Sequence, residues 1–184
     1  TQLQLTGPDG ADRSLDFDTL LLAPGSVPVL PSGFPAGHPH LWDSTAALAL
    51  PEIPPSLLVV GGGYIGLELG SVYAALGSRV TVVEMTGGLL PGLDRDLIVP
   101  LAKRLRSRLH AIHLTTRVAD IADDPSGLRA TLEDLKTGET RSEPFAKILV
   151  AVGRRPNTGD LALDRAGLAA DDRGFIPADA DGRA

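Results

Sequence analysis

The fold is decided by residues 57–84, which begin Leu57-Leu58-Val59-Val60-Gly61-Gly62-Gly63-Tyr64-Ile65-Gly66-Leu67-Glu68-Leu69-Gly70 and end Ser78-Arg79-Val80-Thr81-Val82-Val83-Glu84. This order predicts an apolar strand, a glycine-rich turn, a helix and a second apolar strand that ends in an acid. Three glycines of the turn have the spacing G-x-G-x-x-G, and the flanking elements are those of a dinucleotide-binding βαβ unit. A chance cluster of glycines in a loop would explain neither the strands nor the acid.

The three glycines have different tasks in that pattern. Gly61 allows the tight turn out of the strand, Gly63 lets the backbone approach a pyrophosphate, and Gly66 lets the helix pack close to the sheet. The helix that starts near Tyr64 directs its free N–H groups and partial positive charge at the phosphates. Four apolar residues at helical spacing predict the buried stripe of this helix: Ile65, Leu69, Val72 and Leu76.

The acid at the end of the second strand predicts the type of nucleotide. Glu84 lies 23 positions after Gly61, close to the roughly 20 that the pattern requires. A carboxylate there accepts hydrogen bonds from the adenosine ribose hydroxyls and repels a 2′-phosphate. Residues 85–88 contain no arginine or lysine that would attract that phosphate. The sequence therefore favours NAD over NADP.

Composition narrows the function classes further. Of 184 residues, 43% are hydrophobic, which is enough for a full core. The longest apolar runs are far shorter than a membrane span, and the net charge of −6 argues against a nucleic-acid partner. The chain has no cysteine, which excludes thiol catalysis and thiolate metal sites within it, and the four histidines show no metal-binding spacing, so we predict no metal site.

The expected fold class is α/β, a Rossmann-type three-layer parallel sheet with a three-stranded antiparallel meander inserted. The parallel core occupies about 56–115, the meander 117–145 and a last parallel strand 147–152. Further elements are expected as strands at 1–5, 19–23 and from 174, and as helices at 44–50 and from Asp94 or Asp96 to about Leu109. We expect an NAD-binding domain at 51–156, preceded at 1–50 by a remnant of an FAD-binding domain with its connector, and followed at 157–184 by a segment that returns to that domain.

Four segments together carry a resemblance to a known family: 41–48 (Leu-Trp-Asp-Ser-Thr-Ala-Ala-Leu), the glycine turn, 89–97 (Leu-Leu-Pro-Gly-Leu-Asp-Arg-Asp-Leu) and 151–158 (Ala-Val-Gly-Arg-Arg-Pro-Asn-Thr). In this order and spacing they resemble the flavin-dependent pyridine nucleotide–disulfide oxidoreductases, and among these the dihydrolipoamide dehydrogenases. The resemblance covers nearly the whole chain. One departure is Pro24, which stands where the family has threonine in an Ala-Thr-Gly segment near FAD.

The resemblance implies roles for particular residues. The pyrophosphate region of NAD would be held by Gly61, Gly63, Tyr64, Ile65 and Gly66, and the adenosine ribose by Glu84. Glu68 would lie near the nicotinamide, and Gly153 would line the nicotinamide pocket. Tyr64 stands where related reductases keep an aromatic ring over the flavin, although a packing role on the first helical turn explains it equally well.

The resemblance also implies a larger enzyme. The parent would oxidise dihydrolipoamide with FAD and NAD⁺, as a cytoplasmic homodimer that serves redox homeostasis and is bound to the lipoyl acyltransferase of a 2-oxo acid dehydrogenase complex. The family's redox cysteines and its acid/base pair are absent from these 184 residues, so we expect no catalytic residue in them, binding of NAD(H) and no activity of their own. Two alternatives stay open: a domain of a related FAD/NAD(P)H reductase, and a non-catalytic NAD-binding module.

Overall fold

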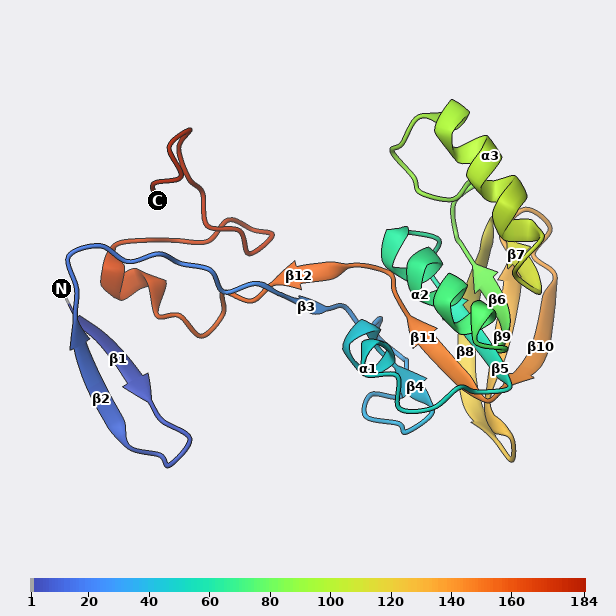
Figure 1. The fold of residues 1–184 in the computed structure, drawn as a ribbon, viewed down its shortest axis with the longest axis horizontal. Helices are drawn as coiled ribbons and strands as arrows, with labels where there is room; N and C mark the ends of the chain where they lie inside the picture. Colours follow the sequence, from blue (N-terminus) through green and yellow to red (C-terminus); the bar gives the residue numbers. More distant parts are fainter. Residues whose placement is uncertain (1) are drawn as a thin grey trace. The chain divides into compact units, whose positions relative to one another are not determined.

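The computed structural model describes residues 2–184 and divides the chain into two compact units (Figure 1). One unit contains the residues up to Ser26 together with Pro156–Ala184, and the other is Val27–Arg155. The second unit contains the glycine turn. It also takes in residues 27–50, which the sequence groups with the segment before the NAD-binding domain.

A five-stranded parallel sheet forms the centre of the unit Val27–Arg155. Its strands are β4 (Leu41–Trp42), β11 (Lys147–Val150), β5 (Ser56–Val60), β6 (Arg79–Val83) and β7 (Ala111–His113), in that spatial order. The three middle strands are apolar along almost their whole length and are buried on both faces. Such continuous apolar strands are typical of parallel sheets that are covered on both sides.

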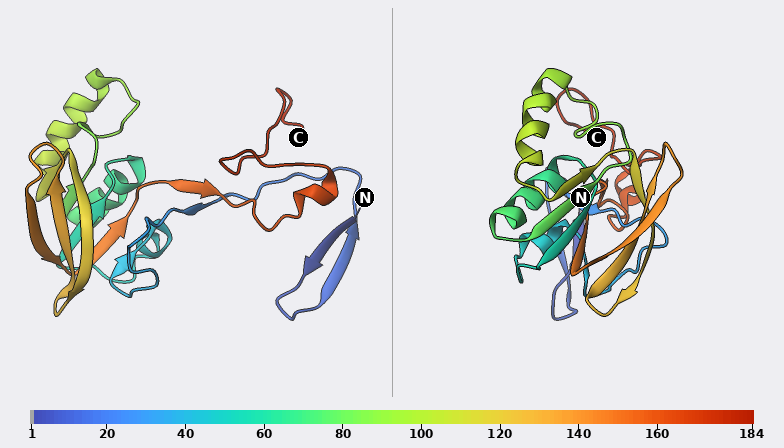
Figure 2. Two further views of the ribbon diagram at one scale, coloured as in Figure 1. Left: turned by 180° about the vertical axis from the view of Figure 1, so that it is seen from behind. Right: turned by 90° about the vertical axis from the view of Figure 1, so that its right-hand side faces the viewer.

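Three helices cover one face of this sheet, and the meander covers the other (Figure 2). The helices are α1 (Ser44–Leu48), α2 (Tyr64–Ala75) and α3 (Arg95–Arg106). Because successive side chains of a strand point to opposite faces, Leu57 and Val59 pack with the helices, whereas Leu58 and Val60 pack with the meander. The result is the three-layer α/β arrangement with an inserted meander that the sequence predicts.

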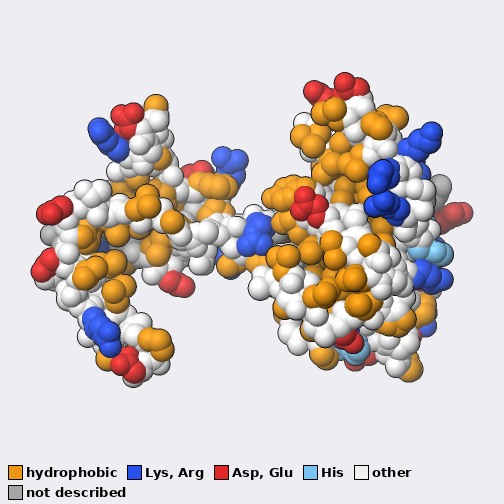
Figure 3. All heavy atoms as spheres, in the orientation of Figure 1, with side chains coloured by type: hydrophobic (Ala, Val, Ile, Leu, Met, Phe, Trp, Pro, Cys, Tyr) orange, Lys and Arg blue, Asp and Glu red, His pale blue; other side chains and the backbone are white. Residues whose placement is uncertain are grey.

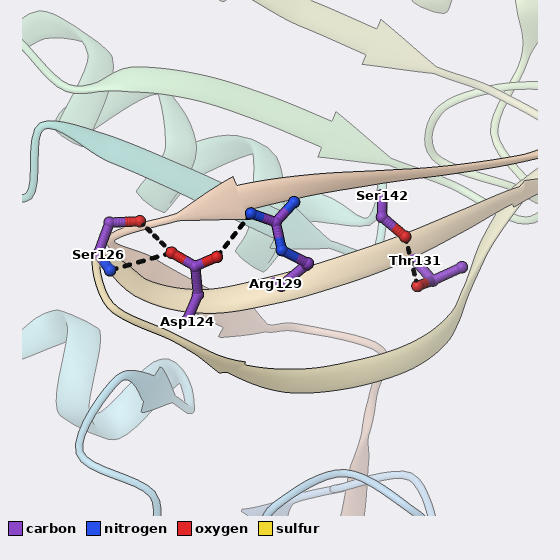
Figure 4. A network of polar contacts seen from close by, with 5 residues as sticks. All are labelled: Asp124, Ser126, Arg129, Thr131 and Ser142. Carbon is purple, nitrogen blue, oxygen red and sulfur yellow. Dashed lines mark hydrogen bonds and ion pairs between the residues drawn. The ribbon is translucent and has the colours of Figure 1, made fainter.

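The meander consists of β8 (Thr116–Asp124), β9 (Gly127–Asp134) and β10 (Thr140–Phe145), paired antiparallel in the order β10-β9-β8. Its outward side chains form polar pairs (Figure 4). Asp124 accepts hydrogen bonds from the backbone N–H and the hydroxyl of Ser126, and it forms an ion pair with Arg129. These contacts fix the turn between β8 and β9. Those hydrogen bonds, chiefly from Ser126, hold the pKa of Asp124 below its ordinary value.

The other unit begins with a hairpin. Strands β1 (Gln2–Thr6) and β2 (Asp12–Asp16) pair antiparallel around a turn at residues 7–10. The predicted strand 1–5 includes Thr1, which lies outside the described residues. In this unit a 3₁₀ helix spans Leu163–Ala166. Strands β3 (Ser26–Pro28) and β12 (Arg154–Pro156) pair with each other, and most of their residues belong to the unit Val27–Arg155.

Two predicted strands are wrong. Residues 19–23 and the segment after Gly174 are irregular, and Leu21 is 88% exposed. Neither segment has a partner strand within residues 2–184, and an apolar run cannot form a stable strand without a sheet to pair with. Conversely, the two-residue strand β4 was not predicted, because it depends on pairing with β11.

The predicted buried stripe of α2 is also wrong in part. Its buried residues are Gly66, Leu67, Leu69, Gly70 and Tyr73, whereas Val72 and Leu76 are exposed. The reason is that the helix rests on the sheet through two glycines: a Cβ on Gly66 or Gly70 would reach the side chain of Val59. The resulting surface is visible in Figure 3, where hydrophobic side chains gather over α1 and α2.

Candidate functional site

A cleft of about 890 Å³ opens at the carboxyl ends of the parallel strands. In doubly wound sheets this edge is where ligands bind. The cleft is lined by the ends of β5 and β6, the first residues of α2, parts of the loop 85–93, the start of β8, the segment 151–154, and Pro31 and Phe34. All of these belong to the unit Val27–Arg155.

The glycine turn forms the floor of the cleft, and each glycine is needed for a different reason. Gly61 has a φ of +112°, and a Cβ there would also collide with the carbonyl of Ala151. At Gly66 a Cβ would collide with the carbonyl of Gly61, so this residue sets how closely α2 approaches the turn. Gly63 differs, because a Cβ there would meet nothing within 4 Å. Gly63 therefore leaves open space above bare backbone, as a bound phosphate requires.

The start of α2 faces that space. Gly63 is its N-cap, with extended backbone (φ −79°, ψ 177°) and no side chain that caps the helix. The first N–H groups of a helix have no partner within the helix, and together with the helix dipole they favour an anion. Tyr64 and Ile65, the first two residues of the helix, both line the cleft, and Tyr64 is 65% exposed.

Glu84 lies at the end of β6, on the wall of the cleft, and only 9% of it is exposed. Its Oε2 accepts a hydrogen bond from the Gly62 N–H and its Oε1 accepts one from the Thr86 N–H, both at 2.7 Å. A carboxylate has about four acceptor positions, so two remain for a ligand. The backbone of Glu84 is also fixed, because its N–H donates to His113 and its carbonyl accepts from Thr116.

The sequence assigns no binding role to the residues that form the side walls. Met85 and Leu90 line the cleft from the loop after β6, and Val118 lines it from β8. Arg117 also lines it, but its guanidinium is paired with the Glu133 carboxylate at 2.8 Å. The only sequence signal for β8 is the alternation that predicts the hairpin, which does not reveal that its first residues cross the end of β6.

The structure brings most of the predicted site residues together. Six of them line the cleft: Gly61, Gly63, Tyr64, Ile65, Glu84 and Gly153. Gly66 lies beneath the turn and acts through packing. Glu68 is exposed on α2 and is not among the residues that line the cleft.

Within residues 2–184, no group of three or more His, Cys, Asp or Glu side chains is placed to hold a metal ion. In the same residues, no helix has the length and apolar character that crossing a membrane requires. The basic residues of α3 (Lys103, Arg104 and Arg106) lie exposed in its last turn.

Comparison with known proteins identifies the family. Residues 1–184 match the model of the pyridine nucleotide-disulphide oxidoreductases. The chain belongs to this family. It is 38% identical over 183 residues to a dihydrolipoyl dehydrogenase of Vibrio cholerae, covering 96% of this chain and 38% of that protein. To the dihydrolipoyl dehydrogenase of Thermus scotoductus it is 42% identical over 163 residues, covering 88% of this chain and 35% of the relative.

Solved structures confirm the fold class of this chain. The flavoprotein disulfide reductase RclA from Escherichia coli superposes with a TM-score of 0.83 at 30% identity, covering 97% of this chain and 39% of that one. LpdA from Mycobacterium tuberculosis gives a TM-score of 0.80 at 29% identity, covering 97% and 38%. The chain thus spans a little over a third of the length of these relatives.

Proposed function

We propose that this chain contributes the NAD(H)-binding domain, residues 51–156, of a dihydrolipoyl dehydrogenase that also uses FAD. Residues 1–50 and 157–184 would belong to the connection with the FAD-binding part. One observation carries the proposal: the bare backbone at Gly63 and the carboxylate of Glu84 meet in a single cleft at the ends of the parallel strands. The curated relatives named dihydrolipoyl dehydrogenase support the assignment.

The cleft fits a dinucleotide part by part. The pyrophosphate would lie over Gly63 and accept hydrogen bonds from the first N–H groups of α2. The ribose hydroxyls would donate to the two free acceptor positions of Glu84. Met85 and Val118 supply apolar surface for the adenine ring at the same end of the cleft.

The nicotinamide end would lie towards Tyr64, Glu68 and Gly153. When bound, NAD⁺ supplies the acceptor for a hydride, and this chain's own residues contribute the orientation of the ring. Tyr64 and Gly153 line the cleft, whereas Glu68 would need the ring to extend beyond it. Gly153 has a φ of +150° and open space where a Cβ would stand, so bare backbone is available at this end too.

Selectivity for NAD over NADP follows from the charges around Glu84. Its carboxylate would lie beside a 2′-phosphate and repel it. Two arginines line the cleft: Arg117 is paired with the Glu133 carboxylate, and Arg154, in the segment 151–154, donates a hydrogen bond to the Ser44 hydroxyl. A 2′-phosphate would therefore meet an uncompensated negative charge, which supports the choice of NAD.

The wider role of the protein follows from the same assignment. We expect a cytoplasmic homodimer that works in redox homeostasis and binds the lipoyl acyltransferase of a 2-oxo acid dehydrogenase complex. The 184 residues alone contain no cysteine. They should bind NADH and yet show no reduction of NAD⁺ by dihydrolipoamide, because a redox disulfide is what that substrate reduces.

Titration calorimetry of the 184-residue chain with NADH and with NADPH tests the proposal. The sharpest variant is Gly63→Ser, because serine is a favoured N-cap and the site has room for it, so the fold should keep its stability. The added side chain would occupy the space for the phosphate and compete for a helix N–H. The affinity for NADH should therefore fall roughly tenfold or more. Gly87→Ser is the matched control, since Gly87 is exposed, has open space and does not line the cleft.

The expected result is binding of NADH in the micromolar-to-millimolar range and much weaker binding of NADPH. Equal NADH binding by Gly63→Ser and by the unmodified chain would show that the nucleotide does not lie over the glycine turn. Absence of any NADH binding by a correctly folded chain would refute the function itself.

A second candidate is a domain of a related FAD-linked reductase. The likeness to the flavoprotein disulfide reductase RclA favours it. Preference for NADPH in the same titration, or a whole protein that is inactive with lipoamide but reduces another acceptor, would support this candidate over the first.

A further inference from the structure

Met85 is the single methionine of the chain, and the chain has no cysteine. Its thioether is therefore the only sulfur in 184 residues. Met85 follows Glu84 directly, lines the cleft and is 60% exposed. A readily oxidised side chain thus lies at the wall of the cleft, beside the carboxylate assigned to the ribose.

We propose that Met85 is an oxidation site whose modification by a peroxide weakens dinucleotide binding to this cleft. The inference rests on the proposed function, because the nucleotide is what the modified wall would exclude. It adds a regulatory input that the binding assignment does not contain. The oxidant is a hydroperoxide such as hydrogen peroxide.

The reaction transfers one oxygen atom from the peroxide to the Met85 thioether. The thioether sulfur attacks one oxygen of the peroxide, an S–O bond forms and the O–O bond breaks. Sulfur loses two electrons, the attacked oxygen gives up its proton, and the second oxygen takes up the electron pair of the O–O bond and a proton and leaves as water when the oxidant is hydrogen peroxide. The product is methionine sulfoxide, which methionine sulfoxide reductases convert back to methionine. The modification is therefore reversible.

The backbone around Met85 cannot move to accommodate the new group. On one side the Glu84 N–H donates to the carbonyl of His113 at 2.8 Å. On the other side the Thr86 N–H donates to the Glu84 carboxylate at 2.7 Å, and the Thr86 carbonyl accepts from Thr115 at 2.9 Å. The Cα of Met85 is therefore held at the cleft wall, and a sulfoxide there places a strong dipole on a surface that the thioether leaves apolar.

The loss in affinity follows from that replacement. The sulfoxide oxygen must lose part of its water when an aromatic base packs on it. Burial of an unpaired polar group at a partly exposed position costs enough to weaken binding about fivefold. NAD⁺ bound first should in turn cover the thioether and slow its oxidation.

The experiment uses the 184-residue chain, treated with hydrogen peroxide, freed of oxidant and titrated with NADH. Mass spectrometry counts the oxygen atoms taken up, and the peptide that carries residue 85 locates them. Met85→Leu, which keeps the apolar volume without sulfur, is compared with its own untreated sample. Met85→Gln, polar and of similar length, reproduces the dipole without an oxidant. A parallel treatment contains saturating NAD⁺.

We expect uptake of one oxygen atom, NADH binding about fivefold weaker after treatment, similar weakening in Met85→Gln, and no effect of peroxide on Met85→Leu. NAD⁺ should slow the uptake. Unchanged affinity of the oxidised chain, or oxidation at the same rate with NAD⁺ bound, would overturn the inference while leaving the binding function intact. No binding of NADH by the untreated chain would overturn the proposed function and this inference together.

Discussion

Replacing Glu84 with glutamine tests both tasks that the structure gives to this side chain. The carboxylate accepts one backbone hydrogen bond on each oxygen, from Gly62 and from Thr86, each at 2.7 Å. Glutamine has a single carbonyl oxygen, so its amide nitrogen must face one of these two N–H groups. Glu84→Gln therefore leaves a backbone donor without an acceptor, in whichever orientation the amide adopts.

The size of the effect on stability can be worked from this geometry. A hydrogen bond to a charged group contributes about 1.5–3 kcal/mol, and an unpaired buried donor costs a similar amount. Glu84 is only 9% exposed, so water cannot replace the lost acceptor. We expect Glu84→Gln to lower the free energy of unfolding by about 2 kcal/mol, or roughly 4–8 °C in Tm for a chain of this length.

The substitution should affect the binding of the two nucleotides differently. Loss of the carboxylate weakens its hydrogen bonds to the ribose, which should reduce NADH affinity roughly tenfold. The same change removes the repulsion of a 2′-phosphate, so NADPH should bind no worse, and the ratio between the two affinities should fall. Thermal melts and calorimetric titrations with both nucleotides measure these quantities.

Glu139→Gln is the matched control, because it removes the same charge from an exposed turn outside the cleft. It should alter neither Tm nor affinity. A Glu84→Gln variant with unchanged Tm would refute the bracing role of the carboxylate. A variant with lowered Tm and an unchanged NADH-to-NADPH ratio would show that Glu84 only braces the turn and does not select the nucleotide.

Three further predictions follow from single contacts. Gly61→Ala combines a φ of +112° with a collision against the carbonyl of Ala151 and should cost roughly 3 kcal/mol, measured by urea unfolding. Tyr73→Phe removes a buried hydroxyl that donates to a backbone carbonyl at 2.8 Å and should cost about 1 kcal/mol in the same assay. Hydrogen bonds from Ser126 lower the pKa of Asp124 in the folded state, so its stabilising effect is present above the ordinary value of 3.8 and is lost as pH falls through the lowered pKa. Asp124→Asn should therefore make thermal melts less sensitive to acid in that range.

The central βαβ unit could be predicted because its signals are local. The turn needs glycine at Gly61 for a backbone reason, and the flanking strands are apolar along their length because both faces are covered. The acid at Glu84 stands at a fixed distance from the turn. Each of these features depends on a few consecutive residues, so the βαβ unit can be predicted without knowledge of distant contacts.

The predictions that are wrong concern segments whose structure is decided by tertiary contacts. β4, only Leu41–Trp42, exists because β11 offers it an edge. Residues 19–23 have the composition of a buried strand, but no strand within residues 2–184 pairs with them. In α2 the apolar spacing pointed to Val72, yet the glycines of the helix decide which side approaches the sheet.

The site was predicted unevenly for the same reason. Its floor and its acid lie within one continuous stretch, so the motif reveals them. Its walls include Arg117 and Val118, which reach the cleft only because β8 crosses the end of β6. No spacing in the sequence records that crossing, since it depends on a hydrogen bond between Thr116 and Glu84 across more than thirty residues.

That hydrogen bond has a wider consequence, because Glu84 connects the glycine turn, the loop after β6 and the start of β8. Its N–H donates to His113 at the end of β7, its carbonyl accepts from Thr116 at the start of β8, and its carboxylate holds Gly62 and Thr86. The floor and both walls thus share one buried residue, whose position is set when the core folds rather than when a ligand arrives. Such preorganisation lowers the cost of ordering the site on binding. It also couples stability to selectivity: any substitution that redirects the cleft towards NADP must first replace the two backbone hydrogen bonds that Glu84 provides.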